Sequence, residues 1–429
     1  MTERLTDDGV WGDPLGEEYD PLGVHLDDPH AFYERARKAE PIFFSPALNA
    51  WVVTRLSEVR RVLRDGATFS SANTLRPFAP LSPRVLAELA ASPYPPCATF
   101  IEMDGEPHRR LRSMVAAPFA PERVAEAEPY IAERAAALAG ELAAECAAHG
   151  RADFMERFAG RLPVDVICRL VGIPAEESEQ VGADGLRAAS LTMAHRFAAE
   201  DEQVEAARAQ ERLRRLIARH VRARLAEPRD DLIGAVTAAC ARGEDGLTPD
   251  REAAAVDLIF GVVLPGHITT SAMLGNGLLR LLTHRDQWRL LCERRDLLPN
   301  AVEEIARYDT PTHVFLRVTT RDAIVAGRYL PAGTEIAVWL AAANRDEEAF
   351  PGGEEFDVSR SAPAGHVTFG YGAHYCLGAP LARLQTEVAL RVLTERLPEL
   401  RLVPGQRIAY RPTLDHRGPL ALQVTRAGR

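Results

Sequence analysis

The chain has 429 residues, of which 46% are hydrophobic and 26% are charged, and its formal net charge is −10 at pH 7. This composition is ordinary for a large globular protein, and the negative charge argues against general binding to nucleic acid through bulk electrostatics. The most apolar segment, AAAVDLIFGVVLPG, contains Asp257 and is too short to span a bilayer, so we expect a soluble protein with no membrane span.

Six cysteines are scattered along the chain, and no two of them are spaced as C-x-x-C. This spacing is neither that of a zinc ribbon nor that of a disulfide framework, and free thiols suit a reducing cytoplasm. The N-terminal residues, MTERLTDDGVWGD, are acidic and polar, which is unlike a secretory signal peptide. We therefore expect a cytoplasmic protein.

The first 100 residues mix short helices with strand-like pieces such as AWVVTRL, residues Ala50–Leu56. From about Pro121 to Arg295, alanine and leucine recur at helical spacing, and this pattern predicts a mostly helical region. Within it, Thr248 and Pro249 predict the start of a helix, because threonine is a common N-cap and proline is favoured at the first helical position.

The pattern changes in the last quarter of the chain. Between about Val314 and Leu340, β-forming residues alternate around a Pro-Ala-Gly turn, which predicts short strands. A meander rich in proline and glycine follows over residues 344–372, and helical spacing then predicts a long helix from near Leu377 that Pro398 stops. No internal repeat or low-complexity linker divides the sequence, so we predict one domain over residues 1–429, mainly α with a minor β part.

The ten residues FGYGAHYCLG, Phe369–Gly378, place Cys376 in a glycine-rich loop immediately before this last long helix. Gly370 and Gly378 let backbone N–H groups approach the cysteine sulfur, and the start of the helix adds a positive dipole. Phe369 can shield the sulfur from water. These features favour a thiolate that binds haem iron, whereas the glycine count alone is equally compatible with a simple turn.

The complete string, Phe-Gly-x-Gly-x-His-x-Cys-x-Gly, closely resembles the haem-thiolate signature of the cytochrome P450 monooxygenases. The resemblance implies a triangular, helix-rich fold with small β-sheets, and it implies that Cys376 is the axial ligand of the iron of haem b. Further motifs resemble those of the family, in the family's order, between about Asp104 and Gly378, which is most of the chain.

Glu304 and Arg307, in AVEEIARYDTP, are three residues apart and therefore lie on one face of a helix. Such a pair is most often a solvated surface contact. Its position ahead of the strands and the cysteine loop resembles that of the family's buried Glu–Arg pair, with Arg360 as the third partner. The resemblance implies a structural network that holds the meander around the haem pocket.

Four residues resemble the family's contacts to the haem propionates: His108 and Arg112 in MDGEPHRRLRSM, Arg317 in LRVTTRD, and His374 in the cysteine loop. His108 and Arg112 are four residues apart and share a helix face, where cationic donors suit carboxylates. Taken alone, the same pattern is also typical of an exposed basic helix.

The segment VDLIFGVVLPGHITTSAML resembles the family's oxygen-binding helix, and Gly266 and Thr269 match the expected residues. Pro265 replaces a small residue and predicts a local helix distortion, because proline cannot donate a backbone hydrogen bond and crowds the preceding turn. Ile268 replaces an acid that feeds protons inward. We therefore expect proton transfer through Thr269 and water, with His267 or a substrate hydroxyl as the donor. Alternatively, the hydroxyl run that begins at Thr269 only bonds back to helix carbonyls.

The resemblance implies an enzyme that activates O2 to hydroxylate or epoxidise a medium or large apolar small molecule. The Gly-His-Ile-Thr-Thr variant is similar to macrolide and polyketide tailoring hydroxylases, which function in antibiotic biosynthesis. The segments expected to line the substrate pocket are residues 78–100, 186–197, the central helix, 312–315 and 414–418.

The sequence contains neither a flavin fingerprint nor a ferredoxin cysteine cluster, so electrons have to come from separate partners. The resemblance implies NAD(P)H, a ferredoxin and a ferredoxin reductase. Arg109, Arg110 and Arg112 either attract an acidic ferredoxin or form an ordinary solvated face.

Other functions stay open at this point. The same iron site suits peroxide-driven oxidation, oxidative coupling or desaturation, and Ile268 favours such chemistry because it removes the usual proton-relay acid. A catalytically silent haem protein that senses or recruits a partner is a second alternative, and a haem-free helical scaffold is a third. The retained Thr269 and the complete cysteine loop favour an enzyme over the last two.

Overall fold

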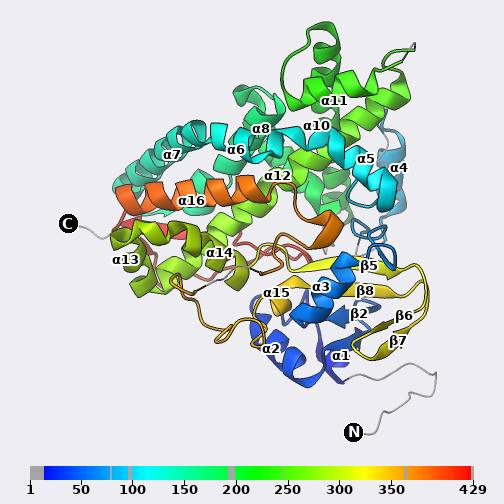
Figure 1. Ribbon diagram of the computed structural model, residues 1–429. Helices are drawn as coiled ribbons and strands as arrows, with labels where there is room; N and C mark the ends of the chain where they lie inside the picture. Colours follow the sequence, from blue (N-terminus) through cyan, green and yellow to red (C-terminus); the bar gives the residue numbers. More distant parts are fainter. Residues whose placement is uncertain are drawn as a thin grey trace.

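The computed structural model of the protein describes residues 14–77, 80–94, 99–191, 199–243, 245–361 and 365–426. Helices make up most of the molecule, and a smaller region around a five-stranded sheet lies at one corner (Figure 1), which confirms the predicted mainly α class. The helices are α1 (Pro14–Glu18), α2 (His30–Ala39), α3 (Leu56–Arg64), α4 (Pro83–Ala90), α5 (Gly105–Val115), α6 (Pro121–Glu126), α7 (Glu128–His149), α8 (Leu162–Val171), α9 (Ser178–Ala188), α10 (Glu200–Ala226), α11 (Leu232–Cys240), α12 (Pro249–Thr283), α13 (Arg285–Glu293), α14 (Leu298–Tyr308), α15 (Leu340–Ala343) and α16 (Ala379–Arg396). The strands are β1 (Ile42–Ser45), β2 (Ala50–Val53), β3 (Phe69–Ser70), β4 (Ala152–Asp153), β5 (Val314–Thr319), β6 (Ala323–Val325), β7 (Arg328–Leu330), β8 (Glu335–Trp339), β9 (Leu400–Leu402) and β10 (Gln423–Arg426).

The five-stranded sheet has the order β1-β2-β8-β5-β3, and β2 and β8 form its parallel pair. Helix α3 packs against it through Val59 and Val62, which share one apolar cluster with Val53 and Ile336. The strand predicted to reach Leu56 ends at Val53 instead. The physical reason is that Leu56, Val59 and Val62 recur at helical spacing and bury one face of α3.

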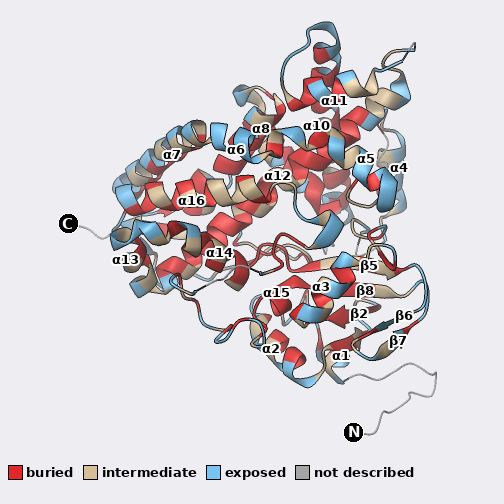
Figure 2. Ribbon diagram, in the orientation of Figure 1, coloured by how far each residue is buried: buried red, intermediate tan, exposed pale blue. Residues whose placement is uncertain are grey.

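Helix α12 crosses the interior of the molecule, and buried residues surround it on most sides (Figure 2). Its start agrees with the prediction: the Thr248 hydroxyl accepts the N–H of Arg251 at 3.4 Å, and Pro249 is the first helical residue. Within the described part of the chain, α12 is the one helix long and apolar enough to cross a membrane. Because 78% of its most apolar window is buried inside the protein, it has the character of a core helix.

The expected distortion of α12 at Pro265 does not interrupt the helix, which continues unbroken through this residue. A proline removes one N–H donor, so Gly261 loses its usual helical partner while the neighbouring turns keep theirs. The side chains of His267 and Thr269 also bond back to the carbonyls four residues earlier, at 2.9 and 3.0 Å. Packing on several sides therefore keeps α12 in one piece.

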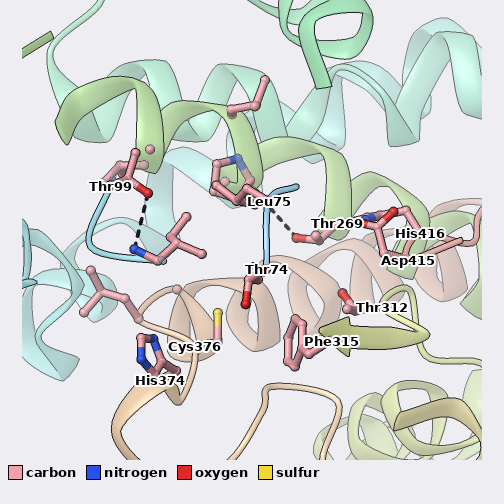
Figure 3. Close-up of a pocket in the computed structure, with 18 of the residues that line it drawn as sticks. Thr74, Leu75, Thr99, Thr269, Thr312, Phe315, His374, Cys376, Asp415 and His416 are labelled. Carbon is pink, nitrogen blue, oxygen red and sulfur yellow. Dashed lines mark hydrogen bonds and ion pairs between the residues drawn. The ribbon is translucent and has the colours of Figure 1, made fainter. Parts of the chain in front are cut away.

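Helix α16 places the cysteine loop. It begins at Ala379, close to the start predicted near Leu377, and ends at Arg396, just before Pro398. It packs against α7, α14 and α12. The loop that precedes it therefore lies opposite the middle of α12 (Figure 3).

Candidate active site

A cavity of about 580 Å³ lies between the middle of α12 and the start of α16. Its volume falls in the range of small-molecule sites. All five segments that the sequence predicted as pocket lining contribute to the cavity wall. The central helix is α12, and the other four segments contribute residues that include Phe100, Leu191, Thr312 and His416. Of the expected segments, residues 78–79, 95–98 and 192–197 lie outside the described residues.

The Cys376 sulfur points into this cavity (Figure 3). The backbone N–H of Cys376 donates to the Phe369 carbonyl at 2.8 Å. In the same loop, Gly370 and Gly372 both have φ of 75°, a backbone conformation that favours glycine. A Cβ on Gly378 would lie 3.9 Å from the sulfur, so the loop backbone lies directly beside it. Phe369 is buried and lines the cavity, as expected of a residue that shields the sulfur.

The electrostatic environment of the Cys376 thiol has two opposing parts. Its residue surface is exposed, but that surface faces the internal cavity rather than bulk solvent, so burial still raises the pKa of the thiol. The N–H groups of Gly378 and Ala379 and the guanidinium groups of Arg112 and Arg383 act in the opposite direction. A coordinated cation would complete the deprotonation of such a sulfur.

Cationic side chains gather at one end of the cavity. Arg112 donates to the Tyr375 carbonyl at 2.6 Å, and Arg317 donates to the Thr74 hydroxyl at 3.0 Å. Neither guanidinium forms an ion pair with a carboxylate among the described residues. Burial lowers the pKa of Arg317 to about 10, which still leaves a cation at neutral pH. Guanidinium groups without a carboxylate partner, one of them buried, suit a ligand that carries carboxylates.

Two histidines complete this end of the cavity. The His108 and His374 rings lie 4.1 Å apart, and His374 Nε2 is 3.2 Å from the Asp104 carboxylate. Burial lowers the pKa of both rings, to about 4 for His374. The Nε2 of His108 is buried and has no hydrogen-bond partner within the described residues. The structure thus brings together the four residues predicted to contact propionates, and it leaves one buried donor free for a ligand.

On the opposite wall, Gly266 and Thr269 line the cavity. A Cβ on Gly266 would lie 2.8 Å from the Ile167 side chain, so α8 approaches α12 closely there. The Thr269 hydroxyl donates to the Pro265 carbonyl at 3.0 Å, which is the back-bonding that the sequence offered as an alternative role. A hydroxyl in this geometry keeps lone pairs free to accept a further proton donor from the cavity.

His267, predicted as a candidate proton donor, does not face the cavity, and this corrects the prediction. Its ring packs against α9, where a Cβ on Gly185 would lie 2.8 Å from Nε2. Its Nδ1 contacts the Val263 carbonyl at 2.9 Å, and burial lowers its pKa to about 4. The physical reason is helix geometry, since consecutive residues of α12 point about 100° apart.

Comparisons with known proteins agree with this site. The sequence model of the family described as Cytochrome P450 matches residues 199–398. The vitamin D(3) 25-hydroxylase of Pseudonocardia autotrophica is 34% identical over 407 residues, which cover 94% of this chain and 95% of that protein. The mycinamicin IV hydroxylase/epoxidase of Micromonospora griseorubida is 35% identical over 383 residues, which cover 87% of this chain and 89% of that protein. The chain belongs to the cytochrome P450 family.

A solved structure has the same fold as this P450. Cytochrome P450 CREJ, in complex with (4-ethylphenyl) dihydrogen phosphate, aligns with a TM-score of 0.88 and 27% identity over 96% of this chain and 99% of that one. The family relation makes the chain a cytochrome P450 monooxygenase with a haem-thiolate iron. The thiol in the cavity and the unpaired cations beside it fit such a cofactor.

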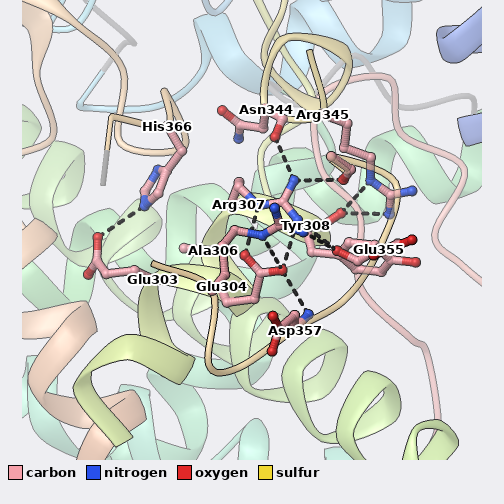
Figure 4. Close-up of polar contacts among 12 residues, drawn as sticks. Glu303, Glu304, Ala306, Arg307, Tyr308, Asn344, Arg345, Glu355, Asp357 and His366 are labelled. Atoms are coloured by element: carbon pink, nitrogen blue, oxygen red, sulfur yellow. Dashed lines mark hydrogen bonds and ion pairs between the residues drawn. The ribbon is translucent and has the colours of Figure 1, made fainter. Parts of the chain in front are cut away.

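The P450 holds Glu304 and Arg307 in a fully buried network (Figure 4), not at the surface. Two guanidinium nitrogens of Arg307 each donate a hydrogen bond of 2.8 Å to one oxygen of the Glu304 carboxylate. The Arg360 Nε lies 3.3 Å from the Glu304 carboxylate, and the Asp357 N–H donates to the same carboxylate at 3.0 Å. Arg307 also donates to three backbone carbonyls of the meander, those of Asn344, Gly353 and Glu355. The geometry is the one predicted for this triad.

Sequence reasoning missed several polar residues that line the cavity of this P450. Gln210 and Arg214 come from α10, and Arg214 pairs with Asp257 of α12 at 2.8 and 3.0 Å. Glu102 also lines the cavity, and burial raises its pKa. Asp257, inside the most apolar segment of the sequence, was the one available signal for Arg214, because a buried carboxylate requires a cationic partner.

Proposed function

We propose that this P450 hydroxylates or epoxidises a medium or large apolar small molecule of macrolide or polyketide type in secondary-metabolite biosynthesis. The main support for this proposal is the cavity of about 580 Å³ between Cys376 and Thr269, which is lined mostly by apolar side chains. The similarity to a mycinamicin IV hydroxylase/epoxidase supports this substrate class. Gln210 and Arg214 supply a few polar contacts for orienting such a molecule.

In this proposal the cofactor is haem b and Cys376 is its axial ligand. When bound, the haem supplies oxygen activation, which a thiolate ligand favours. Gly370 and Gly378 give the loop its close turn, and Phe369 shields the sulfur. The four residues at the cationic end of the cavity hold the propionates: His108, Arg112, Arg317 and His374.

Haem retention tests the propionate assignment. Arg317→Ala is expected to speed haem loss to apomyoglobin, because hydrogen bonds to charged groups contribute about 1.5–3 kcal/mol each. Arg321→Ala is the matched control, since Arg321 bonds to the Thr68 hydroxyl and does not line the cavity. Equal rates of haem loss in the two variants would contradict the assignment.

Thr269 is proposed to hold a proton at its hydroxyl and to pass it into the cavity, where the haem would activate oxygen. Thr269→Ala should still bind substrate and oxidise NADH, but the product formed per NADH should fall about tenfold and peroxide should rise, because a positioned proton donor is lost. Thr283→Ala is the control: Thr283 lies on the same helix and makes the same type of back-bond, to Leu279 at 2.7 Å. Full coupling in Thr269→Ala would remove Thr269 from the relay.

Electrons are proposed to come from NAD(P)H through a ferredoxin and its reductase, in the cytoplasm. Arg109 and Arg110 are exposed on α5 and are available to an acidic partner, whereas Arg112 turns toward the cysteine loop. We further propose that residues 1–429 form one domain, because the largest apolar cluster joins α7, α8, α12 and α16.

The proposed function is tested by screening compounds for a low-spin to high-spin shift and identifying products by mass spectrometry. Oxygenated macrolides or polyketides formed with a surrogate ferredoxin and reductase would support it. Products formed with added peroxide, and none with reductase, would favour the peroxide-driven alternative that Ile268 suggests. Binding without any product would favour a silent haem protein.

A further inference from the structure

Monooxygenation consumes O2, two electrons and two protons, and it yields the oxygenated product and water. Both protons have to reach a cavity inside the protein. Helix α12 offers no source for them near Thr269: Ile268 carries only carbon, and His267 packs against α9. The Thr269 hydroxyl is occupied by the Pro265 carbonyl, so it can pass on a proton but needs a donor.

We propose that Asp415 and His416, the relay pair, supply protons to the Thr269 side of the cavity from a buried water site behind His416. This inference rests on the monooxygenase reaction and is independent of the substrate class proposed above. The Asp415 Oδ2 lies 3.2 Å from the His416 Nδ1, and both residues line the same cavity as Thr269. Figure 3 labels the pair and Thr269 among the residues of this cavity.

The turn that carries the relay pair is fixed against α12. A Cβ on Gly418 would lie 2.7 Å from the Cβ of Ala272, about one helical turn beyond Thr269. Hydrogen bonds hold the backbone of the turn: the N–H of His313 donates to Asp415 at 2.8 Å, the N–H of Arg417 donates to Pro311 at 2.8 Å, and the Thr413 hydroxyl donates to His416 at 2.5 Å. Asp415 and His416 are therefore held in place at this wall of the cavity.

A second cavity, of about 20 Å³, lies behind the turn, and His416, His313, Arg417 and Tyr33 contribute to its lining. Its size suits one water molecule. Several lining atoms are buried without a hydrogen-bond partner within the described residues: His313 Nε2, Arg417 Nε and both ring nitrogens of His416. A water there would bond to one ring nitrogen of His416 and to His313 or Arg417, and so reduce the number of isolated buried polar atoms, which are costly. His416 lines both cavities and therefore connects the water site with the cavity that holds Thr269.

Other titratable and charged groups surround the relay pair. Burial and nearby arginines hold the pKa of His313 at about 3 and that of His30 well below its usual range. Both therefore remain neutral at pH 7, and neither lines the cavity of Thr269, whereas His416 lines both cavities. The groups that face this region are His30 and Tyr33 of α2, Arg280 of α12, Asp309 and His313 after α14, Arg345 after α15, and Tyr410, Arg411 and Arg417 near the turn.

The proposed transfer balances without any co-reactant beyond those of the reaction. A proton leaves the His416 imidazole as an O–H bond forms on a cavity water, and the Thr269 hydroxyl passes a proton onward. The imidazole regains its proton from the water in the second cavity, and that water takes a proton from bulk solvent in turn, so no hydroxide is left behind. The Asp415 carboxylate, 3.2 Å from the His416 Nδ1, faces the positive charge that the ring carries during the transfer.

Two variants of the holoenzyme test the proposal with a surrogate reductase and a compound that the wild type oxidises. His416→Gln keeps a polar side chain that cannot titrate, and it should lower product per NADH about tenfold, raise peroxide and increase the solvent isotope effect on product formation. Asp415→Asn should act in the same direction. His220→Gln is the matched control, because His220 forms another imidazole–carboxylate pair, with Glu177 at 2.7 Å, and lines neither cavity.

Two readouts do not depend on turnover. Because Asp415 and His416 also line the substrate cavity, the Kd from the spin-state shift should change less in both variants than product per NADH measured at saturating compound. A high-resolution experimental structure of the wild type should show a water in the second cavity bonded to His416.

A dry second cavity overturns the proposal, and so does wild-type coupling in both variants. If His416→Gln fails to fold, as loss of its ferrous–CO spectrum would show, the test rests on two other results. These are the product per NADH of Asp415→Asn and the presence of a water in the second cavity. If the wild type oxidises no macrolide or polyketide, the proposed substrate class fails, while the water site and any other oxidised compound still test the relay.

Discussion

Replacing Cys376 by alanine is expected to abolish the red-shifted Soret band of the ferrous–CO protein, together with all O2-dependent product formation. The Cys376 sulfur is the one thiol that faces the cavity among the described residues, and an alanine methyl group cannot bind iron. Without thiolate donation, the cofactor loses the electron push that favours O–O cleavage. The CO difference spectrum of haem-reconstituted protein measures the first effect, and product analysis measures the second.

Cys292→Ala is the control for this substitution. Cys292 lies on α13 and does not line the cavity, so its variant should keep the wild-type CO spectrum. Cys146, Cys168 and Cys240 should be dispensable for the same reason, and Cys97, expected to be equally dispensable, lies outside the described residues. A thiolate-type spectrum in Cys376→Ala would refute the axial assignment.

Glu304→Ala is expected to yield little folded, haem-loaded protein. Removing the carboxylate leaves the fully buried Arg307 without its charge partner, which lowers the free energy of unfolding by about 3–5 kcal/mol. That loss is a large fraction of the roughly 5–15 kcal/mol that stabilises a typical domain. Denaturant unfolding and the ratio of haem absorbance to protein concentration measure the two effects.

The exposed pair of Arg294 and Asp296 provides the contrast. It has a similar contact distance, 2.7 Å, but both side chains are more than half exposed to solvent. Asp296→Ala should therefore leave haem loading and the unfolding midpoint unchanged, because water screens exposed charges. If Glu304→Ala also folds and loads haem like the wild type, the buried triad is not a structural requirement.

Local sequence patterns predicted those parts of the fold that depend on neighbours in the chain. Thr248 and Pro249 identified the start of α12, and the string around Cys376 identified the loop ahead of α16. Capping, turn formation and glycine conformations are interactions over a few residues, so the sequence carries them directly. The strand predicted through Leu56 failed where two local patterns overlapped and burial of the α3 face decided between them.

By itself, the sequence determined the family, the mainly α class and the identity of the thiol and cations that suit a haem. The tertiary structure alone decided that His267 turns toward α9 and that Gln210 and Arg214 reach the cavity of Cys376. These outcomes depend on contacts between residues far apart in the chain. Many weak packing interactions set such contacts together, and no short stretch of sequence records their sum.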